Sequence, residues 1–282
     1  MTSTRTLPSP LPRFGRLLLT GAAGQLGRVL RQRLRPYCDR LRVSDLAALE
    51  PATDDGEEVV RCDLADAAAV RRLLDGVDGV VHFGGVSVEA AWEPILQANI
   101  VGVKNLYEAA RLNGTRRVIF ASSNHVVGMY SQGEVLEVDA APRPDGYYGL
   151  SKAFGEDTAQ LYFDRHGVET VSIRIGSVTP APIDRRMLAT WLSFDDLERL
   201  IIAGLRAPVV GHSIVYGRSD NHGTFWDNRG AAHLGWRPQD SSEPWRAELE
   251  ARQPVIDPKD PVHRLIGGRF VVIGPLGEPD GA

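Results

Sequence analysis

The sequence is poor in the features that mark several common classes of protein. Only two of its 282 residues are cysteines, Cys38 and Cys62, and two cysteines can form one disulfide but no framework of disulfides. We therefore expect two free thiols in a reducing compartment. No apolar run approaches the roughly 18 residues that cross a bilayer. The scattered histidines also lack metal-ligand spacing, so we predict neither a membrane span nor a metal site.

Neither sign of charge is in large excess. The formal net charge is -4 and the isoelectric point is close to 6.0, which gives no reason to expect nucleic acid or an anionic membrane as a partner. Hydrophobic residues make up 43% of the chain and charged residues 24%, the balance of an ordinary soluble globular protein. The composition therefore argues against membrane and nucleic-acid partners but selects no function by itself.

The chain divides into three segments that differ in composition and in the regularity of their sequence patterns. Residues 1–15 are rich in proline and carry arginines without an acid, and no apolar stretch of a secretory signal follows them. We predict a disordered tail on a cytoplasmic protein, with a short transit peptide as the alternative. Residues 16–175 are predicted to form one nucleotide-binding domain. Residues 176–282 are less regular and rich in Trp and His, and we expect a smaller substrate-binding lobe and a C-terminal tail there.

Strand and helix patterns alternate through residues 16–175. Short apolar runs at 16–20, 40–45, 58–62, 79–83, 117–121 and 169–175 suit buried strands, and helical patterns cover 94–112 and 147–165. Such alternation predicts an α/β fold with a Rossmann-like, doubly wound parallel sheet. In the smaller lobe we expect a helix at 194–205 and strands at 212–216 and 269–273.

A glycine-rich turn follows the first predicted strand directly. Gly21, Gly24 and Gly27 are spaced for a tight turn, for close approach of a pyrophosphate to the backbone, and for close packing of helix on strand. Gln25 and Leu26 complete the turn and are predicted to contact the cofactor as well. A glycine trio alone is a weak signal, but a trio between a strand and a helix predicts dinucleotide binding.

Acidic residues end the second and third predicted strands. Asp45 lies where a carboxylate would bind the ribose hydroxyls of NAD and repel the 2′-phosphate of NADP. Arg42 would favour NADP, but strand alternation makes it an outward charge, so NAD is the predicted cofactor. Asp63 and Leu64 follow the third strand, where an adenine could rest against the loop.

Polar residues also follow the fourth and fifth predicted strands. Ser87 is a candidate substrate contact, with a helix cap as the alternative. Ser123, Asn124 and His125 leave the fifth strand at the same sheet edge as the glycine turn, so they are predicted to face the cofactor. Such a cluster at a strand end is more often functional than structural.

Tyr148 and Lys152 are four residues apart on a predicted helix, hence on one face of it. There the ammonium, helped by a cofactor ribose, could lower the pKa of the phenol from about 10 and make it a usable base. Alone, the pair is a frequent coincidence on a solvated helix face. With the glycine turn and Ser123, it predicts a catalytic group.

Taken in order, these motifs resemble the extended branch of the short-chain dehydrogenase/reductase superfamily. Several longer stretches are similar to the uronate dehydrogenase family within that branch, and the similarity covers residues 16–275. These stretches begin at Phe83, Phe120, Arg143, Arg174, Arg186 and Leu234. The resemblance implies NAD-dependent oxidation of galacturonate or glucuronate at C1 to an aldarolactone, with Tyr148 as base, Lys152 holding the ribose and Ser123 orienting the reacting oxygen.

The resemblance also assigns the substrate contacts. A substrate carboxylate calls for the planar fork of a guanidinium, and Arg186 matches the family position for that role. Ser87, Asn124, His125 and Ser177 would bind sugar hydroxyls or the carboxylate. A surface charge is the alternative for Arg186, and positioning of the loop is the alternative for His125. Because this superfamily generally associates, we expect a homo-oligomer.

Two rival functions use the same scaffold. A nucleotide-sugar epimerase or dehydratase shares the Tyr, Lys and Ser, but it needs a larger C-terminal lobe than the hundred or so residues that remain here. A non-catalytic NAD sensor commonly loses the tyrosine or lysine, and this chain keeps Tyr148, Lys152 and Ser123.

Overall fold

The computed structural model describes residues 13–253 and 256–273. Its centre is a sheet of seven parallel strands in the order β3-β2-β1-β4-β5-β6-β9. The strands are β1 (Phe14–Thr20), β2 (Cys38–Asp45), β3 (Glu57–Arg61), β4 (Gly79–His82), β5 (Arg117–Ser123), β6 (Glu169–Ile175) and β9 (His212–Gly217). The predicted Rossmann-like α/β fold is thus confirmed. Of the predicted disordered tail, residues 1–12 lie outside the described part, whereas Phe14 and Gly15 already belong to β1.

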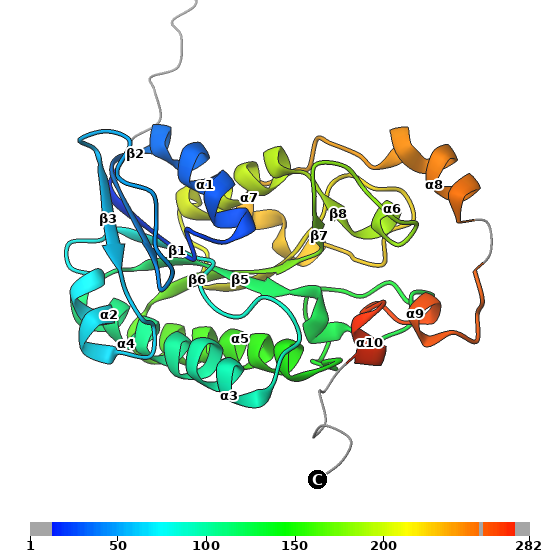
Figure 1. Ribbon diagram of the computed structural model, residues 1–282, viewed down its shortest axis with the longest axis horizontal. Helices are drawn as coiled ribbons and strands as arrows, with labels where there is room; N and C mark the ends of the chain where they lie inside the picture. The colour runs from blue at the N-terminus through cyan, green and yellow to red at the C-terminus, as the bar shows by residue number, and fades with distance from the viewer. Residues whose placement is uncertain (1–12, 254–255, 274–282) are drawn as a thin grey trace, which may run out of the picture.

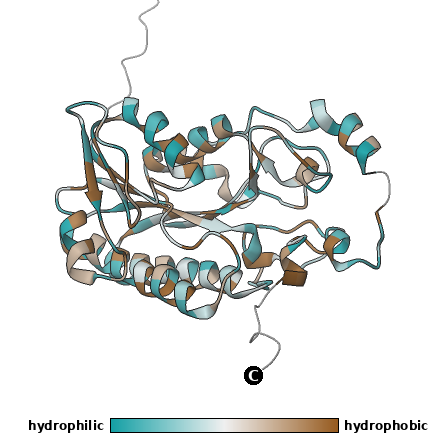
Figure 2. Cartoon of the chain, viewed as in Figure 1, coloured by the Kyte–Doolittle hydropathy of each residue, from teal (hydrophilic) through white to brown (hydrophobic). Residues whose placement is uncertain are grey.

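Helices cover both faces of the sheet (Figure 1). On one face lie α1 (Gln25–Leu34) and α7 (Phe194–Arg206), and on the other lie α2 (Ala67–Leu73), α4 (Gly102–Asn113) and α5 (Tyr147–His166). Leu17 and Leu19 of β1 pack in the cluster under α1 and α7, whereas Leu18 packs in the cluster under α2, α4 and α5. Both faces are therefore buried, which explains why the strand reads as one apolar run. In Figure 2 α1 is mostly hydrophilic on its outer side.

The helix predicted at 94–112 lies within a longer helical segment. It begins as α3 (Trp92–Ile95), widens into a π-helix (Leu96–Val101) and continues as α4. Asn99 in the π-helical turn is buried and binds the loop after β4: its Oδ1 accepts from the Val86 N–H at 2.8 Å and its Nδ2 donates to the Val86 carbonyl at 3.0 Å. π-helical turns often occur at functional sites. We infer that this turn, through Asn99, holds the loop after β4 in place.

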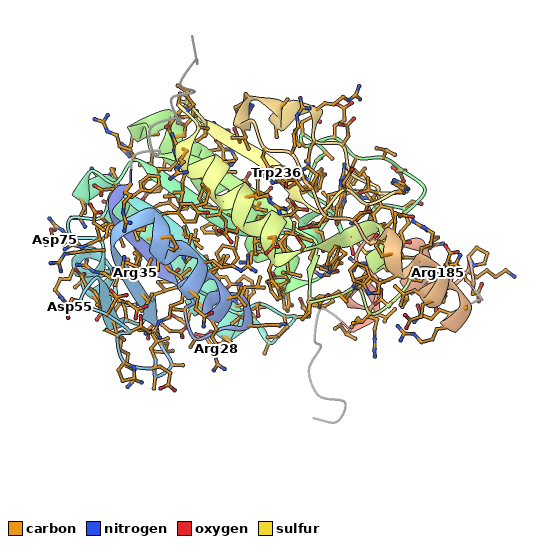
Figure 3. The ribbon with its side chains drawn as sticks, turned by 90° about the horizontal axis from the view of Figure 1, so that it is seen from above. Arg28, Arg35, Asp55, Asp75, Arg185 and Trp236 are labelled. Carbon is orange, nitrogen blue, oxygen red and sulfur yellow. The ribbon has the colours of Figure 1, made fainter. Side chains whose placement is uncertain are left out.

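The remaining elements are short. They are β7 (Ser177–Val178), β8 (Trp191–Leu192), α6 (Met187–Thr190), α8 (Arg246–Arg252), α9 (Pro261–Arg264), α10 (Phe270–Ile273) and the 3₁₀ turns Arg35–Tyr37, Asn124–Val127, Arg229–Leu234 and Glu243–Trp245. Seen from above, α1 and α7 lie side by side, and Arg185 lies beside α8 at the end of the molecule far from Arg28 and Arg35 (Figure 3). The described helices include none that is long and apolar enough to span a bilayer.

Two expectations for the C-terminal part need revision. The strand predicted at 269–273 is wrong: the chain turns at Gly268 (φ 61°), and hydrogen bonds between residues three apart form α10 instead, with no strand of the sheet beside it. The division after residue 175 stays a prediction, because β9 joins the main sheet beside β6 and α7 packs on one face of that sheet. The helix predicted at 194–205 and the strand predicted at 212–216 are both present.

Candidate active site

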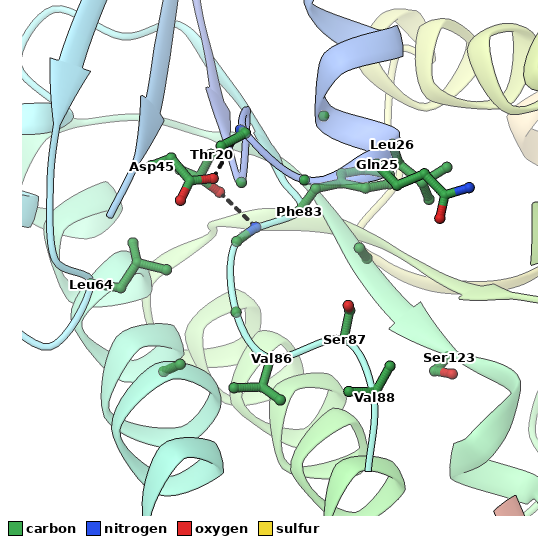
Figure 4. A pocket seen from close by; sticks show the side chains of 18 of the residues that line it. Thr20, Gln25, Leu26, Asp45, Leu64, Phe83, Val86, Ser87, Val88 and Ser123 are labelled. Atoms are coloured by element: carbon green, nitrogen blue, oxygen red, sulfur yellow. Dashed lines mark hydrogen bonds between the residues drawn. The ribbon is translucent and has the colours of Figure 1, made fainter. Parts of the chain in front are cut away.

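A pocket of about 840 Å³ opens at the carboxyl edge of the sheet (Figure 4). We call it the cofactor crevice. Every residue predicted to contact the cofactor lines it: Gly21, Gly24, Gln25, Leu26, Gly27, Asp45, Asp63, Leu64 and Lys152. Ser87, Ser123, His125 and Tyr148 line the same crevice. The structure therefore brings together residues that lie up to 131 positions apart in the chain, from Gly21 to Lys152.

The glycine turn is shaped for close approach of a ligand to the backbone. Gly21 has a positive φ of 74°, which favours glycine, and a Cβ there would collide with the carbonyl of Phe83. A Cβ on Gly27 would collide with the carbonyl of Gly21, so helix α1 can lie against the turn only with glycine there. Since α1 has no acidic residue in its first turn, its N-terminus suits a pyrophosphate.

Carboxylates fix the far side of the crevice. Asp45 accepts hydrogen bonds from the N–H groups of Ala23 (2.9 Å) and Ala47 (3.0 Å), which holds its side chain next to the glycine turn. Asp63 accepts from the N–H of Ala65 at 2.8 Å. Arg42, by contrast, donates to Glu58 at 2.7 Å and does not line the crevice. The arrangement fits a cofactor that carries free ribose hydroxyls and no phosphate at that position.

Tyr148 and Lys152 project from the first turns of α5 and are buried, with 8% and 7% of their surfaces exposed. The ammonium of Lys152 donates to the Ala121 carbonyl at 2.7 Å. Burial lowers the pKa of Lys152 to about 8. Burial also raises the pKa of Tyr148 to about 12, an effect that a hydrogen bond with Ser123 opposes. In the protein alone the phenol is therefore protonated at neutral pH.

Glu89 holds the start of α5 in place, and sequence reasoning missed it. Its two carboxylate oxygens accept from the N–H groups of Tyr147 (3.0 Å) and Tyr148 (2.9 Å). Because Glu89 belongs to the loop that also carries Ser87, this contact ties that loop to the helix of the tyrosine. Glu89 lies 59 residues before Tyr148 in the chain, so no local capping pattern could have revealed it.

A second pocket of about 900 Å³ adjoins the crevice, and we call it the substrate pocket. Asn124, His125, Ser177 and Arg186 all line it, and His125 lines both pockets. Ser87 does not line the substrate pocket; it is exposed at the cofactor crevice. The structure therefore brings together four of the five predicted substrate contacts outside the catalytic residues.

Arg186 has one arm of its guanidinium free for a ligand. Its Nε donates to the Ile266 carbonyl at 2.8 Å and its Nη1 to the Ser177 hydroxyl at 3.4 Å. Its Nη2 is buried without a hydrogen-bond partner among the described residues, as is Oδ1 of Asn124. Burial lowers the pKa of Arg186, but an arginine keeps its charge at any ordinary pH. Unpaired buried polar atoms are costly, so these two mark a place for a polar ligand.

His125 is held from two sides by residues that the sequence did not single out. Its Nδ1 lies 2.6 Å from Oδ2 of Asp145, and its ring stacks on Phe270 with 3.8 Å between the centroids. The ring of Tyr148 lies edge-on at 5.7 Å. Phe270 comes from α10, the segment predicted as a strand, so its place in the pocket could not be foreseen.

The chain is similar to known proteins along nearly its whole length. A model of the NAD dependent epimerase/dehydratase family matches residues 17–193. Uronate dehydrogenase of Pseudomonas syringae pv. tomato is 58% identical over 278 residues, which cover 99% of this chain and 100% of that protein. The chain belongs to the uronate dehydrogenase family. The resemblance inferred from the sequence is thereby confirmed.

Solved structures of the family share the fold over nearly the whole chain. A tyrosine-to-alanine variant of uronate dehydrogenase from Agrobacterium tumefaciens, complexed with NAD, is 52% identical with a TM-score of 0.91, covering 94% of this chain and 100% of that one. Glucuronic acid dehydrogenase from Chromohalobacter salexigens is 51% identical with a TM-score of 0.90, covering 92% and 97%. Together with the family match, the NAD complex of the Agrobacterium tumefaciens variant confirms the prediction of NAD as cofactor.

Proposed function

We propose that the protein oxidises a hexuronic acid, galacturonate or glucuronate, at C1 with NAD and releases an aldarolactone. The observation that carries the proposal is Arg186: it lines a pocket that joins the cofactor crevice at His125, and its buried Nη2 has no hydrogen-bond partner among the described residues. A planar guanidinium matches a carboxylate with two parallel hydrogen bonds. A sugar held there by its C6 carboxylate would present its other end towards the crevice.

In the mechanism, each buried polar group near the place where the crevice and the substrate pocket meet has one role. Tyr148 takes the proton of the anomeric hydroxyl as the hydride leaves C1, and Ser123 donates a hydrogen bond that orients the reacting oxygen towards it. NAD supplies the hydride acceptor. Gly21, Gly24, Gln25, Leu26 and Gly27 would hold its pyrophosphate, Asp45 and Lys152 its two riboses, and Asp63 and Leu64 its adenine.

The state of the phenol sets a condition on this mechanism. Burial raises the pKa of Tyr148 to about 12, so loss of its proton at neutral pH needs positive charge close by. The Lys152 ammonium lies 5.6 Å from the centroid of the Tyr148 ring and is the group placed to supply that charge. Asn124, His125 and Ser177 would bind the sugar hydroxyls, and Ser87 would contact the substrate from the crevice side.

The decisive experiment follows NADH absorbance while the purified protein is offered NAD with galacturonate, glucuronate, neutral aldoses or UDP-sugars. We expect NADH from the uronates only. Activity on neutral aldoses alone would contradict the assignment of Arg186. Protein that retains NAD through gel filtration and forms no net NADH from any uronate would point to a nucleotide-sugar epimerase.

Three further proposals concern the setting of the enzyme. Residues 176–282 act as the substrate lobe, which Ser177, Arg186 and Phe270 support by lining the substrate pocket. The protein works in the cytoplasm as a homo-oligomer. Analytical ultracentrifugation of the NAD complex tests the association, with a monomer at micromolar concentration as the contrary result.

A further inference from the structure

Asp145 is a carboxylate enclosed behind the substrate pocket. Its side chain has no exposed surface, and its one hydrogen bond among the described residues joins its Oδ2 and Nδ1 of His125, 2.6 Å apart. Gly128, Gly149 and Gly267 pack so closely around the carboxylate that a Cβ on Gly128 or Gly267 would collide with it. Three backbone segments thus enclose the carboxylate.

The contact with Asp145 bears on where the proton of the imidazole lies. With Asp145 ionised, its carboxylate only accepts, and the hydrogen in the 2.6 Å contact then belongs to Nδ1 of His125. Burial lowers the pKa of His125, and the charge of Arg186 lowers it too, while Asp145 and Glu89 act in the opposite direction. A neutral imidazole with its proton on Nδ1 carries a lone pair on Nε2.

We propose that Asp145 is a positioning residue that fixes the Nδ1–H form of His125, so that Nε2 accepts a hydrogen bond from a substrate hydroxyl and the substrate carboxylate is left to Arg186. The stacking of Phe270 on the ring, at 3.8 Å, fixes the plane in which Nε2 points. The proposal rests on the proposed function, because it divides the recognition of a uronate between two side chains.

The geometry also separates this role from that of the catalytic tyrosine. Nδ1 of His125 faces the enclosed carboxylate, so Nε2, across the ring, faces the pockets that the residue lines. An imidazolium there would donate to a carboxylate and compete with Arg186. A neutral imidazole instead selects a ligand with a donor hydroxyl at that point. His125 would then recognise a hydroxyl of the sugar, while Arg186 recognises its carboxylate.

The first test is spectroscopic and needs no turnover. In the NAD complex labelled with ¹⁵N-histidine, with the His125 signals assigned by their loss in His125→Asn, we expect at pH 7 a protonated Nδ1 and an unprotonated Nε2. In Asp145→Asn the amide can donate as well as accept, so the preference for Nδ1–H should be lost. A protonated Nε2 in the unmodified protein would overturn the proposal, whatever the enzyme oxidises.

The second test is kinetic, with a matched control. Asp145→Asn should raise KM for the uronate about twofold to tenfold, the usual range for losing a hydrogen bond between neutral groups, while NAD affinity stays unchanged. Asp196, whose side chain is equally buried but bonds no residue that lines either pocket, gives the control Asp196→Asn, which tests the cost of removing any buried carboxylate. Equal losses of stability in both variants with no change of uronate KM in Asp145→Asn would reduce Asp145 to a structural role.

The third test uses deoxyfluoro uronates, because fluorine replaces a hydroxyl without being able to donate. One member of the 2-, 3- and 4-fluoro series should bind the unmodified protein about tenfold more weakly, and should lose little in His125→Ala, where the acceptor is gone. This arm stands even if Asp145→Asn does not fold. Equal binding of the whole series to the unmodified protein contradicts the proposal. Absence of NADH from any uronate contradicts the proposed function instead.

Discussion

The cofactor crevice and the substrate pocket lie side by side, but they are built in different ways. The crevice takes its shape from backbone: the turn at Gly21 and Gly27 would be blocked by any side chain, and Asp45 is held by two backbone N–H groups. The substrate pocket takes its chemistry from long side chains, and Arg186 and Asn124 each keep a buried atom without a partner among the described residues.

This difference has an energetic meaning. A crevice whose polar groups already have partners is close to its final form and can be shared by many enzymes that use one cofactor. Unpaired atoms such as Nη2 of Arg186 reduce stability until a ligand with the right groups pairs them, and so they discriminate among ligands. Changes in the crevice should therefore alter cofactor use and turnover, and changes in the substrate pocket should alter uronate KM.

The largest effect is expected at the junction of the two pockets. Tyr148→Phe removes the phenolic oxygen and little else from a side chain that is 8% exposed, so we expect kcat to fall by at least about 10³-fold, within the range for a lost acid–base group. NAD affinity, measured by quenching of protein fluorescence, should stay near that of the unmodified protein. Near-normal turnover would show that Tyr148 is not the base.

Arg186→Ala should act on the substrate pocket alone. Removing one side of a buried, hydrogen-bonded charge pair costs about 2 to 5 kcal/mol, so uronate KM should rise by roughly two to three orders of magnitude with little change in NAD affinity. Arg185→Ala is the matched control, because Arg185 is adjacent but donates to the carbonyl of Gln253 instead. Similar losses in both variants would contradict a specific role for Arg186.

More of the residues of the crevice than of the substrate pocket could be predicted from the sequence, and the reason is physical. The glycine turn and the pair Tyr148 and Lys152 are contiguous patterns, and parallel strands bring their carboxyl ends to one edge, so their meeting could be predicted. Arg186 was identified only through the family resemblance, since nothing local distinguishes it from Arg185.

The residues that were missed act across long separations. Glu89 caps a helix that starts 58 residues later, and Asp145 meets His125 through a loop that returns to the pocket. Phe270 was placed in a predicted strand because its apolar neighbours suit one, whereas Gly268 turns the chain into α10 and sets the ring against His125. Each depends on tertiary packing that overrides local propensity.

A variant of Lys152 should show how much a buried charge in the crevice lowers the free energy of unfolding. Burial lowers its pKa to about 8 from the ordinary 10.5, so the charged form destabilises the fold at pH 7 by about 3 kcal/mol. Lys152→Met should therefore abolish turnover yet raise the free energy of unfolding of the cofactor-free protein by about 2 to 3 kcal/mol, since it also loses the bond to Ala121.

The pH dependence of that difference has a definite sign. Above pH 8 the folded protein loses the proton while the unfolded chain keeps it up to about 10.5, so the unmodified protein gains stability as pH rises through this window. The advantage of Lys152→Met should thus be full below pH 8 and shrink towards pH 10.5. Urea unfolding at pH 7 and pH 9.5 measures it, and a constant difference would mean that Lys152 is not buried in its charged form.

The smallest effect is expected at the outer edge of the crevice. Asp45→Asn keeps an oxygen that can accept from the N–H of Ala23 but removes the charge that repels a 2′-phosphate. We expect the ratio of kcat/KM for NAD over NADP to fall about tenfold, or about 1.4 kcal/mol, with uronate KM unchanged. Because Asp45 is partly exposed, the preference of the unmodified protein should also weaken as salt is raised. Asp63→Asn, a second carboxylate of the same crevice, is the control and should leave the ratio almost unaltered, so that an equal change in both variants would assign the preference to the total charge of the crevice instead of to Asp45.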